Sequence, residues 1–218
     1  IMALSTIDSN LHRMAKKELI TTSAIPEVLK KIKTTTSIEV AATDADLVIE
    51  AASENPAIKA NIFRQLDTLT HPSCILATNT SSIPITKLAA ETTRLDKVIG
   101  MHFMNPVPVM KLVEVIRGYA TSDQVCNTVM ELSKKLGKTP VEVNDYPGFV
   151  ANRILMPMIN EAIYTLYEGV AGVAEIDNVM KLGMSHPMGP LALADFIGLD
   201  VCLSILRIMH EGFGNPKY

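Results

Sequence analysis

Short apolar runs alternate with helix-like segments along most of this 218-residue chain, and this alternation constrains the fold more than any other feature. The runs have the length of strands, and the segments between them carry apolar residues at helical spacing. Such an alternation predicts βαβ units and a mainly parallel sheet. The expected strands are 37–42, 47–52, 74–78, 98–102, 111–116 and 141–143, and the expected helices between them are 56–69, a short one from Pro84, and 122–136 with Gly137 as its C′ residue.

The pattern changes after Gly148, because from there onward the apolar spacing is helical and no convincing strand appears. A domain boundary near Asp145 follows, with an α/β domain at 1–145 and an all-helical domain at 146–218. The helices expected outside the α/β alternation are 1–19, 23–32, 149–168, 174–182 and one from Pro190 onward.

Composition and charge exclude several classes of function. The net charge is −3 and no long block of like charges occurs, so nothing favours a nucleic-acid partner. Apolar stretches stay below the ~18 residues that a membrane-spanning helix needs. The three cysteines, Cys74, Cys126 and Cys202, form no CxxC pair, which predicts reduced, buried thiols and no metal site.

Polar residues follow successive expected strands, at the edge of the sheet where ligands bind in open α/β folds. Glu54 follows one strand, Asn79 to Ser82 follow the next, and His102 to Asn105 follow the third. This arrangement predicts a site at the carboxyl ends of the strands, with His102 as a candidate general base.

His102 ends an apolar strand, and histidine is the natural proton acceptor near neutral pH. A buried structural histidine with local partners is the alternative interpretation. Glu114 favours catalysis, because it interrupts an apolar strand and a buried carboxylate needs a cationic or hydrogen-bonding partner. A pairing in which Glu114 holds His102 in one tautomer and stabilises its charged form accounts for both residues. The alternative without a catalytic role is that Glu114 points to solvent from an edge strand.

Other polar residues have structural interpretations of their own. On local sequence alone, Asn79 to Ser82 are best explained as an ordinary helix cap before Pro84, with Ser82 as the N-cap. Asn152 and Arg153, early in an expected helix, also fit a solvated helix surface.

Four segments together resemble the signature of 3-hydroxyacyl-CoA dehydrogenases of the short-chain, 3-hydroxybutyryl-CoA type. They are NTSS at 79–82, GMHFMNPVPVMKLVEV at 100–115, PGFVANR at 147–153, and MKLG with PMGP between 180 and 190. The resemblance covers essentially the whole chain and departs slightly at Met104, where the family usually has Phe. It implies a Rossmann-type NAD(P)-binding domain, followed by part of an all-helical domain that binds substrate and forms dimers.

The resemblance implies reversible, nicotinamide-dependent oxidation of a (3S)-3-hydroxyacyl-CoA to a 3-oxoacyl-CoA, in fatty-acid β-oxidation or butyrate-type metabolism. His102 is then the general base, and Glu114 orients it. Ser81 and Asn152 hydrogen-bond the reacting oxygen and the nearby acyl group. Converting an alcohol to a carbonyl requires such a proton acceptor, with donors around the changing oxygen.

The resemblance also implies a cofactor and partners. The expected cofactor is NAD, with NADP as the alternative, and the expected partners are an acyl-CoA substrate and a second copy of the chain. A cytoplasmic location is expected, or the mitochondrial matrix in a eukaryote. Arg13 and Lys17 resemble basic positions that meet the phosphates of coenzyme A, and a solvated helix face is the alternative. The positions expected to contact the dinucleotide are Glu54, Lys59, Asn79 and Asn105.

Two departures from the family pattern matter. The chain has no GxGxxG loop to seat a pyrophosphate, and it stops where the family continues with more helix. We therefore expect a chain that is truncated at both ends, lacks the first strand and glycine loop, and binds its cofactor weakly. The alternatives are a catalytically inactive fragment, a structural relative of the crystallin kind, and a hydroxy-acid dehydrogenase that acts without coenzyme A. That last class commonly uses a lysine where this chain has only Arg153 as a basic residue.

Overall fold

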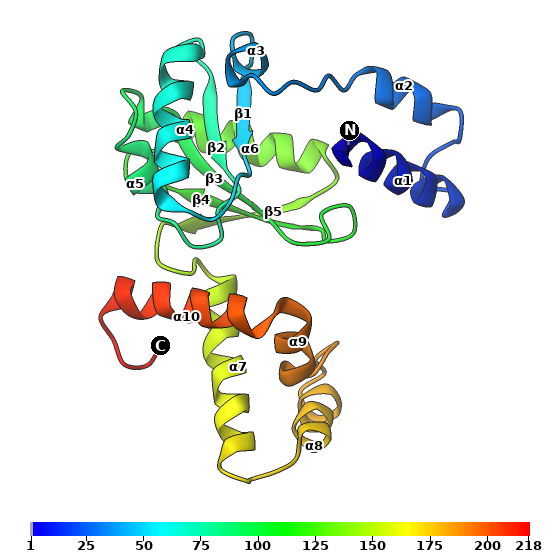
Figure 1. Ribbon diagram of the computed structural model, residues 1–218, viewed down its shortest axis with the longest axis vertical. Helices are drawn as coiled ribbons and strands as arrows, with labels where there is room; N and C mark the ends of the chain where they lie inside the picture. The colour runs from blue at the N-terminus through cyan, green and yellow to red at the C-terminus, as the bar shows by residue number, and fades with distance from the viewer. Residues whose placement is uncertain (1) are drawn as a thin grey trace. The chain divides into compact units, whose positions relative to one another are not determined.

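The computed structural model describes residues 2–218, and it divides into two compact units, Ile1–Ala41 and Ala42–Tyr218 (Figure 1). The first unit contains helices α1 (Met2–Lys16) and α2 (Ala24–Lys30), which confirms the two helices expected there. Ile1, at the start of the first expected helix, lies outside the described residues.

The strand expected at 37–42 is wrong, because these residues form a short helix, α3 (Ile38–Ala42). Ser37 begins the turn, since its hydroxyl accepts a hydrogen bond from the amide of Val40 at 3.3 Å. Ile38 and Val40 produced the alternating pattern, but both are exposed and neither lies in a sheet. Alternation without a buried face therefore did not make a strand here.

The second unit is built on a five-stranded sheet in which the strands follow one another in chain order. Only β3 and β4 are antiparallel, while every other neighbouring pair is parallel, so the mainly parallel sheet is confirmed. Because the chain reverses direction between β3 and β4, each paired residue of one strand lies directly opposite a residue of the other. The strands are β1 (Leu47–Glu50), β2 (Ile75–Thr78), β3 (Val98–Phe103), β4 (Leu112–Arg117) and β5 (Thr139–Asn144).

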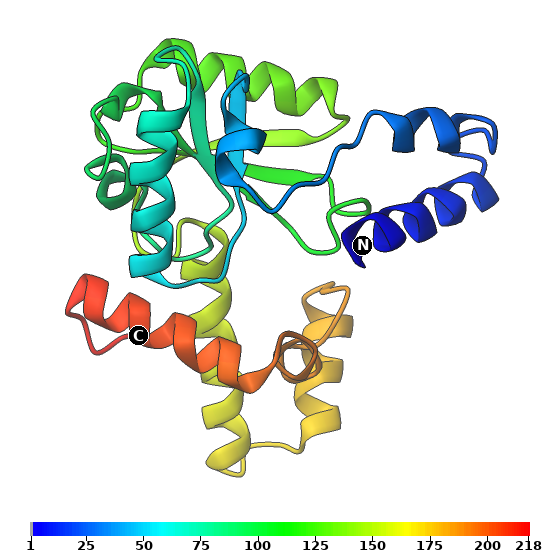
Figure 2. The same ribbon diagram turned by 45° about the horizontal axis from the view of Figure 1, so that its top comes forward.

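Helices cover both faces of this sheet in a Rossmann-like arrangement, as Figures 1 and 2 show. On one face, α4 (Pro56–Leu69) and α5 (Ile85–Ala89) pack on an apolar cluster that includes Phe63 and Leu76. On the other face, α6 (Asp123–Lys135) packs on a second cluster. Successive β3 residues serve the two faces in turn, which is the two-residue period of a strand buried on both sides.

Local signals fix where these helices begin and end. Asn55 caps α4 by accepting the amides of Ala57 and Ile58, and Pro56 occupies the first turn. Helix α6 ends as expected at Gly137, whose φ of +73° is a left-handed conformation that glycine adopts without strain. The chain therefore leaves α6 at a defined angle and enters β5.

The remainder of the second unit is helical, as expected. Helices α7, α9 and α10 share a core with Met156, Ile159 and Met209 at its centre. The single helix expected from Pro190 is instead two, because the chain breaks at Gly198, where φ is +101°. No helix of the described residues could cross a membrane. The elements are α7 (Ala151–Tyr167), α8 (Val173–Asn178), the π-helical turn η2 (Val179–Gly183), α9 (Pro190–Ile197) and α10 (Leu199–Phe213), and a 3₁₀ turn, η1 (Leu95–Lys97), precedes β3.

Candidate active site

His102 and Glu114 face each other across the antiparallel pair of strands, at the same register position of β3 and β4. The Nδ1 atom of His102 lies 2.8 Å from Oε2 of Glu114, and both residues are buried. This excludes a Glu114 that points to solvent, because only 2% of the residue is exposed. A carboxylate on Nδ1 fixes the tautomer in which Nδ1 carries the proton, so the other ring nitrogen, Nε2, is left as an acceptor.

The second oxygen of Glu114 binds the start of α7. Its Oε1 accepts the backbone amides of Val150 at 3.1 Å and Ala151 at 3.0 Å. Burial alone would raise the pKa of Glu114, but the hydrogen bonds from His102 and from these amides outweigh burial and hold the pKa below its usual value. The group is therefore a carboxylate at neutral pH, as a partner of the imidazole must be.

Phe149 is a neighbour of His102 that sequence reasoning missed. Its ring centroid lies 5.8 Å from that of the imidazole at a tilt of 58°, and the residue is buried. Phe149 and Gly148 both have positive φ, at +49° and +75°, and this turn directs the first amides of α7 toward Glu114. A strained conformation at a non-glycine residue next to a candidate base was not readable from the sequence.

Several donors of the loop after β2 hydrogen-bond to Glu54, so this loop does not serve as an ordinary helix cap. One oxygen, Oε1, accepts the amides of Ser81 at 3.0 Å and Ser82 at 3.1 Å, together with the hydroxyls of Thr80 and Ser82. The expected role of Ser82 as N-cap is therefore wrong, because α5 begins after Pro84 without a side-chain cap and the Ser82 hydroxyl donates to Glu54 instead.

The charge of Glu54 is stabilised by the same contacts. Burial would raise its pKa, but the Thr80 and Ser82 hydroxyls, the Lys59 ammonium and the Ser81 amide together hold the pKa below its usual value. About a third of the side chain, 34%, remains exposed, so the carboxylate also presents a polar edge outward.

Lys59 is fully buried on α4, and Glu50 is the partner that sequence reasoning missed. The Lys59 ammonium lies 2.8 Å and 2.9 Å from the two oxygens of Glu50, and 3.5 Å from Oε2 of Glu54. Glu50 ends β1 and also accepts the hydroxyl of Thr78 at 2.7 Å. The signal was available, since Glu50 interrupts the apolar run 47–52 of the sequence, as Glu114 interrupts its own apolar run.

The three asparagines of the expected site lie in different surroundings. Asn79 joins the ends of β2 and β3, since its Oδ1 accepts the amide of Phe103 at 2.8 Å. Asn152, in the first turn of α7, donates from Nδ2 to the carbonyl of Ser81 at 3.2 Å, which connects the helix to the loop after β2. Asn105 lies exposed in the loop after β3.

Hydrogen bonds and ion pairs thus connect most of the expected site residues to their neighbours at the sheet edge and the start of α7. Arg13 and Lys17 belong to the other compact unit, where both are exposed. No cluster of His, Cys, Asp or Glu suited to a metal ion occurs among residues 2–218, and the three cysteines are free and buried as expected.

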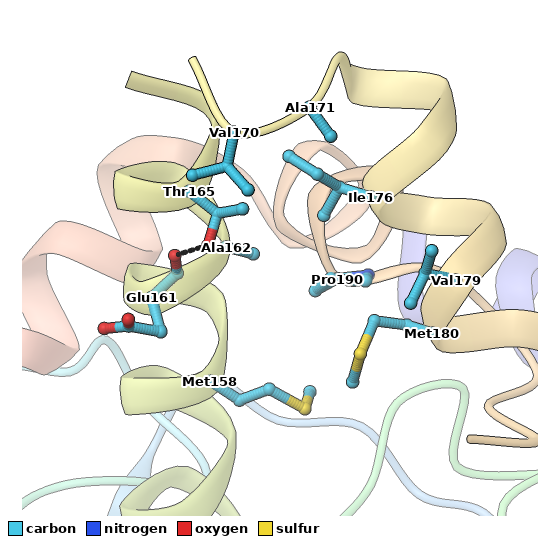
Figure 3. A pocket seen from close by; sticks show the side chains of 10 residues that line it. All are labelled: Met158, Glu161, Ala162, Thr165, Val170, Ala171, Ile176, Val179, Met180 and Pro190. Atoms are coloured by element: carbon cyan, nitrogen blue, oxygen red, sulfur yellow. Dashed lines mark hydrogen bonds between the residues drawn. The ribbon is translucent and has the colours of Figure 1, made fainter. Parts of the chain in front are cut away.

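An apolar cavity of about 380 Å³ lies in the helical part, between α7 and α8 (Figure 3). Met158 and Met180 lie toward one end of it and Val170 and Ala171 toward the other. None of the residues that line it belongs to the set around His102. Glu161 is the one ionisable residue among those that line the cavity, and the cavity is therefore separate from the His102–Glu114 pair.

Family comparisons agree with this geometry. The model of "3-hydroxyacyl-CoA dehydrogenase, NAD binding domain" matches residues 2–146, and that of "3-hydroxyacyl-CoA dehydrogenase, C-terminal domain" matches residues 148–218. The chain belongs to the 3-hydroxyacyl-CoA dehydrogenase family. It is an NAD-dependent oxidoreductase, so the expected enzyme class, fold class and cofactor are confirmed.

Individual relatives are similar over nearly the whole chain. A protein of Bacillus subtilis named "Probable 3-hydroxybutyryl-CoA dehydrogenase" is 59% identical over 215 residues, which are 99% of this chain and 75% of that protein. The human mitochondrial hydroxyacyl-coenzyme A dehydrogenase is 42% identical over 94% of this chain and 67% of its own length. The crystal structure of (S)-3-hydroxybutyryl-CoA dehydrogenase PaaH1 from Ralstonia eutropha superposes with a TM-score of 0.94 and 53% identity, covering 98% of this chain and 75% of that one. The expected truncation at both ends is not supported by these matches.

Proposed function

We propose that the protein catalyses the reversible, NAD-dependent oxidation of a short-chain (3S)-3-hydroxyacyl-CoA, 3-hydroxybutyryl-CoA above all, to the 3-oxoacyl-CoA. One observation carries this proposal, the buried pair of His102 Nδ1 and Glu114 Oε2 at 2.8 Å. Nε2 of His102 makes no hydrogen bond among residues 2–218, so it can accept a proton as a general base must. The names and identities of the relatives support the substrate class.

In the forward direction, Nε2 of His102 accepts the proton of the substrate 3-hydroxyl while C3 loses a hydride, and the C3–O bond becomes a carbonyl. Glu114 stabilises the imidazolium that results. The Ser81 hydroxyl, which has no hydrogen bond among the described residues, and the Asn152 amide donate to the reacting oxygen and the acyl carbonyl. In the reverse direction, His102 returns the proton to the oxygen of the 3-oxo group.

The residues at the strand ends fit the nicotinamide end of a dinucleotide. Bound NAD supplies the hydride acceptor in this reaction. We assign Glu54, Lys59, Asn79 and Asn105 to the wall that holds it: Glu54 and Asn105 present polar groups outward, and Asn79 keeps its amide NH₂ available. Lys59 has a side chain only 1% exposed and belongs to this wall through its carboxylate partners. We place the division between this NAD-binding domain, 1–145, and the helical domain, 146–218, at the turn after Asp145.

Two further assignments concern partners. Arg13 and Lys17 are proposed to bind the phosphates of coenzyme A, supported by their exposed positive charge. A homodimer formed through the helical domain is supported by large apolar side chains that this domain exposes, among them Leu182 at 82% and Phe196 at 71%. A cytoplasmic location is proposed from the bacterial relatives.

The experiment compares acetoacetyl-CoA with free acetoacetate as oxidants of NADH, at saturating NADH because the chain has no GxGxxG loop. We expect turnover with acetoacetyl-CoA, formation of the 3S product, and a kcat/KM at least about 10²-fold lower for acetoacetate, because the binding energy of coenzyme A is lost. Equal use of the two substrates indicates a dehydrogenase that acts without coenzyme A. No turnover with either, in a folded protein that binds NADH, indicates a catalytically inactive, structural relative.

A further inference from the structure

The buried Lys59–Glu50 pair contacts two segments. One is the end of β2, which precedes Ser81 in the chain, and the other is the loop 51–54, which ends at Glu54. Glu50, at the end of β1, accepts the hydroxyl of Thr78 at 2.7 Å and the amide of Ala52 at 2.5 Å. Lys59, from α4, donates to the carbonyl of Ala52 at 3.2 Å as well as to both oxygens of Glu50. The pair therefore fixes the end of β2 and the start of the loop 51–54 at once.

Glu54 is the last residue of that loop, and it transmits the constraint. The helix cap by Asn55 holds the loop on the α4 side, and the Lys59 ammonium lies 3.5 Å from Oε2 of Glu54. The other oxygen of Glu54, Oε1, accepts hydrogen bonds from the backbone amides of Ser81 and Ser82. The backbone of Ser81 is thus held while its hydroxyl stays uncommitted.

The burial of this network argues that it has a positioning role. Lys59 is 0% and Glu50 5% exposed, although a buried ion pair is weak evidence for added stability compared with apolar residues of the same volume. What the pair does supply is a defined place for Glu54, since one ammonium lies within 4 Å of both carboxylates. A rigid support for donors is what preorganised catalysis needs.

We propose that Lys59 and Glu50 are positioning residues that act on the reaction through Glu54, by holding the backbone of Ser81 so that its hydroxyl faces the substrate. The substrate-facing role of Ser81 rests on the proposed function, whereas the support of the loop by the buried pair does not. Lys59 on this account needs no direct contact with the dinucleotide.

The test replaces the pair with neutral groups of similar size, Lys59→Met together with Glu50→Gln, so that no buried charge is left alone. Amide hydrogen exchange is measured at Ser81 and Ser82, with the β3 amides as the reference for global opening. We expect exchange at Ser81 and Ser82 to accelerate at least about tenfold relative to β3, since hydrogen bonds to a charged acceptor are loosened. Unchanged protection of these two amides overturns the proposal.

A matched control removes another largely buried ion pair that does not contact the loop, Arg94 with Asp67, by Arg94→Met with Asp67→Asn. This control is expected to leave the ratio of exchange at Ser81 to exchange in β3 unchanged. An equal rise of that ratio in the control would show that general loosening is responsible, and would contradict a specific role of Lys59 and Glu50.

Turnover separates this inference from the proposed function. If both hold, the Lys59→Met, Glu50→Gln variant lowers kcat more than it raises the KM for acetoacetyl-CoA. Adding Ser81→Ala to this variant then lowers kcat little further. Loosened amides with a normal kcat support the positioning contact and contradict the substrate-facing role given to Ser81. Protected amides with a lowered kcat contradict the positioning role instead.

Discussion

Glu114 and Glu54 are two carboxylates of the same sheet region with closely similar support. Each accepts two successive backbone amides through one oxygen, Glu114 from residues 150 and 151 and Glu54 from residues 81 and 82. In each, the second oxygen faces a cationic or ionisable group, His102 in one case and Lys59 in the other. The pKa of each is held below its usual value against the opposing effect of burial.

The difference lies in the partner. An imidazole can donate from one nitrogen and accept at the other, whereas an ammonium group has donors only. The Glu114 centre can therefore accept a proton at the second imidazole nitrogen, whereas the Lys59 ammonium beside Glu54 has no lone pair with which to accept one. Two carboxylates with the same backbone support thus serve different purposes, and the side chain opposite each one decides which.

Of the variants that distinguish the two centres, Glu114→Gln should have the largest effect on turnover. Loss of the charge removes the stabilisation of the imidazolium, and kcat is expected to fall about 10³-fold. Steady-state turnover of acetoacetyl-CoA measures this. Glu142→Gln, which alters an exposed acid on β5, serves as the control and should leave turnover unchanged. A kcat within a few-fold of normal for Glu114→Gln would mean that the two carboxylates do not differ in the way described.

Ser81→Ala and Ser82→Ala should separate chemistry from support within the Glu54 centre. The Ser81 hydroxyl makes no hydrogen bond within residues 2–218, so its loss is expected to lower kcat about 10²-fold with little change in stability. The buried Ser82 hydroxyl donates to Glu54 at 2.8 Å, so its loss should cost about 1–3 kcal/mol in the free energy of unfolding. Urea unfolding and turnover of both variants provide the check, and a reversed pattern would exchange the roles of the two serines.

The acid dependence of stability should sharpen the comparison further. A carboxyl group whose pKa is lowered by folding stabilises the protein above its unfolded pKa, and this contribution is lost as the pH falls toward the folded pKa. The difference in unfolding free energy between the wild type and Glu114→Gln should therefore be largest near neutral pH and shrink below about pH 4.3, the ordinary value for Glu. Urea unfolding across this range measures it, and a difference that grows on acidification would contradict the lowered pKa of Glu114.

The smallest expected effect concerns the other compact unit. Arg13→Gln with Lys17→Gln should raise KM for acetoacetyl-CoA a few-fold at low salt and leave kcat unchanged, because exposed charges contribute little and are screened. Lys30→Gln, in the same unit but paired with Glu27, is the matched control. If KM for the double variant does not respond, the two residues form an ordinary solvated helix face.

The sequence predicted those features that depend on periodicity and on isolated polar residues in apolar runs. The strands from β1 to β5, the position of α4 and the end of α6 at Gly137 followed from spacing and from local caps. Glu114 was found because a carboxylate interrupts an apolar strand, and the same rule applied to Glu50 would have found the partner of Lys59.

What the sequence could not predict depends on contacts between distant residues. The strand expected at 37–42 needed a partner strand to exist, and its residues formed α3 instead. The Ser82 hydroxyl had a local use as a cap, but Glu54, 28 residues away, was the acceptor that it found. The ring of Phe149 lies near His102 because Phe149 itself has a positive φ after Gly148, and a left-handed conformation at a phenylalanine is not predictable from residue type.

The most direct test of the account is the rate of acetoacetyl-CoA reduction by NADH in the wild type and in His102→Ala, with His71→Ala as the control. His71 is an exposed histidine that lies 2.8 Å from the hydroxyl of Ser73, outside the site. The account predicts turnover that falls up to about 10⁴-fold in His102→Ala and stays normal in His71→Ala. Near-normal turnover in His102→Ala, in a protein that folds and binds NADH, would contradict the assignment of His102 as the base.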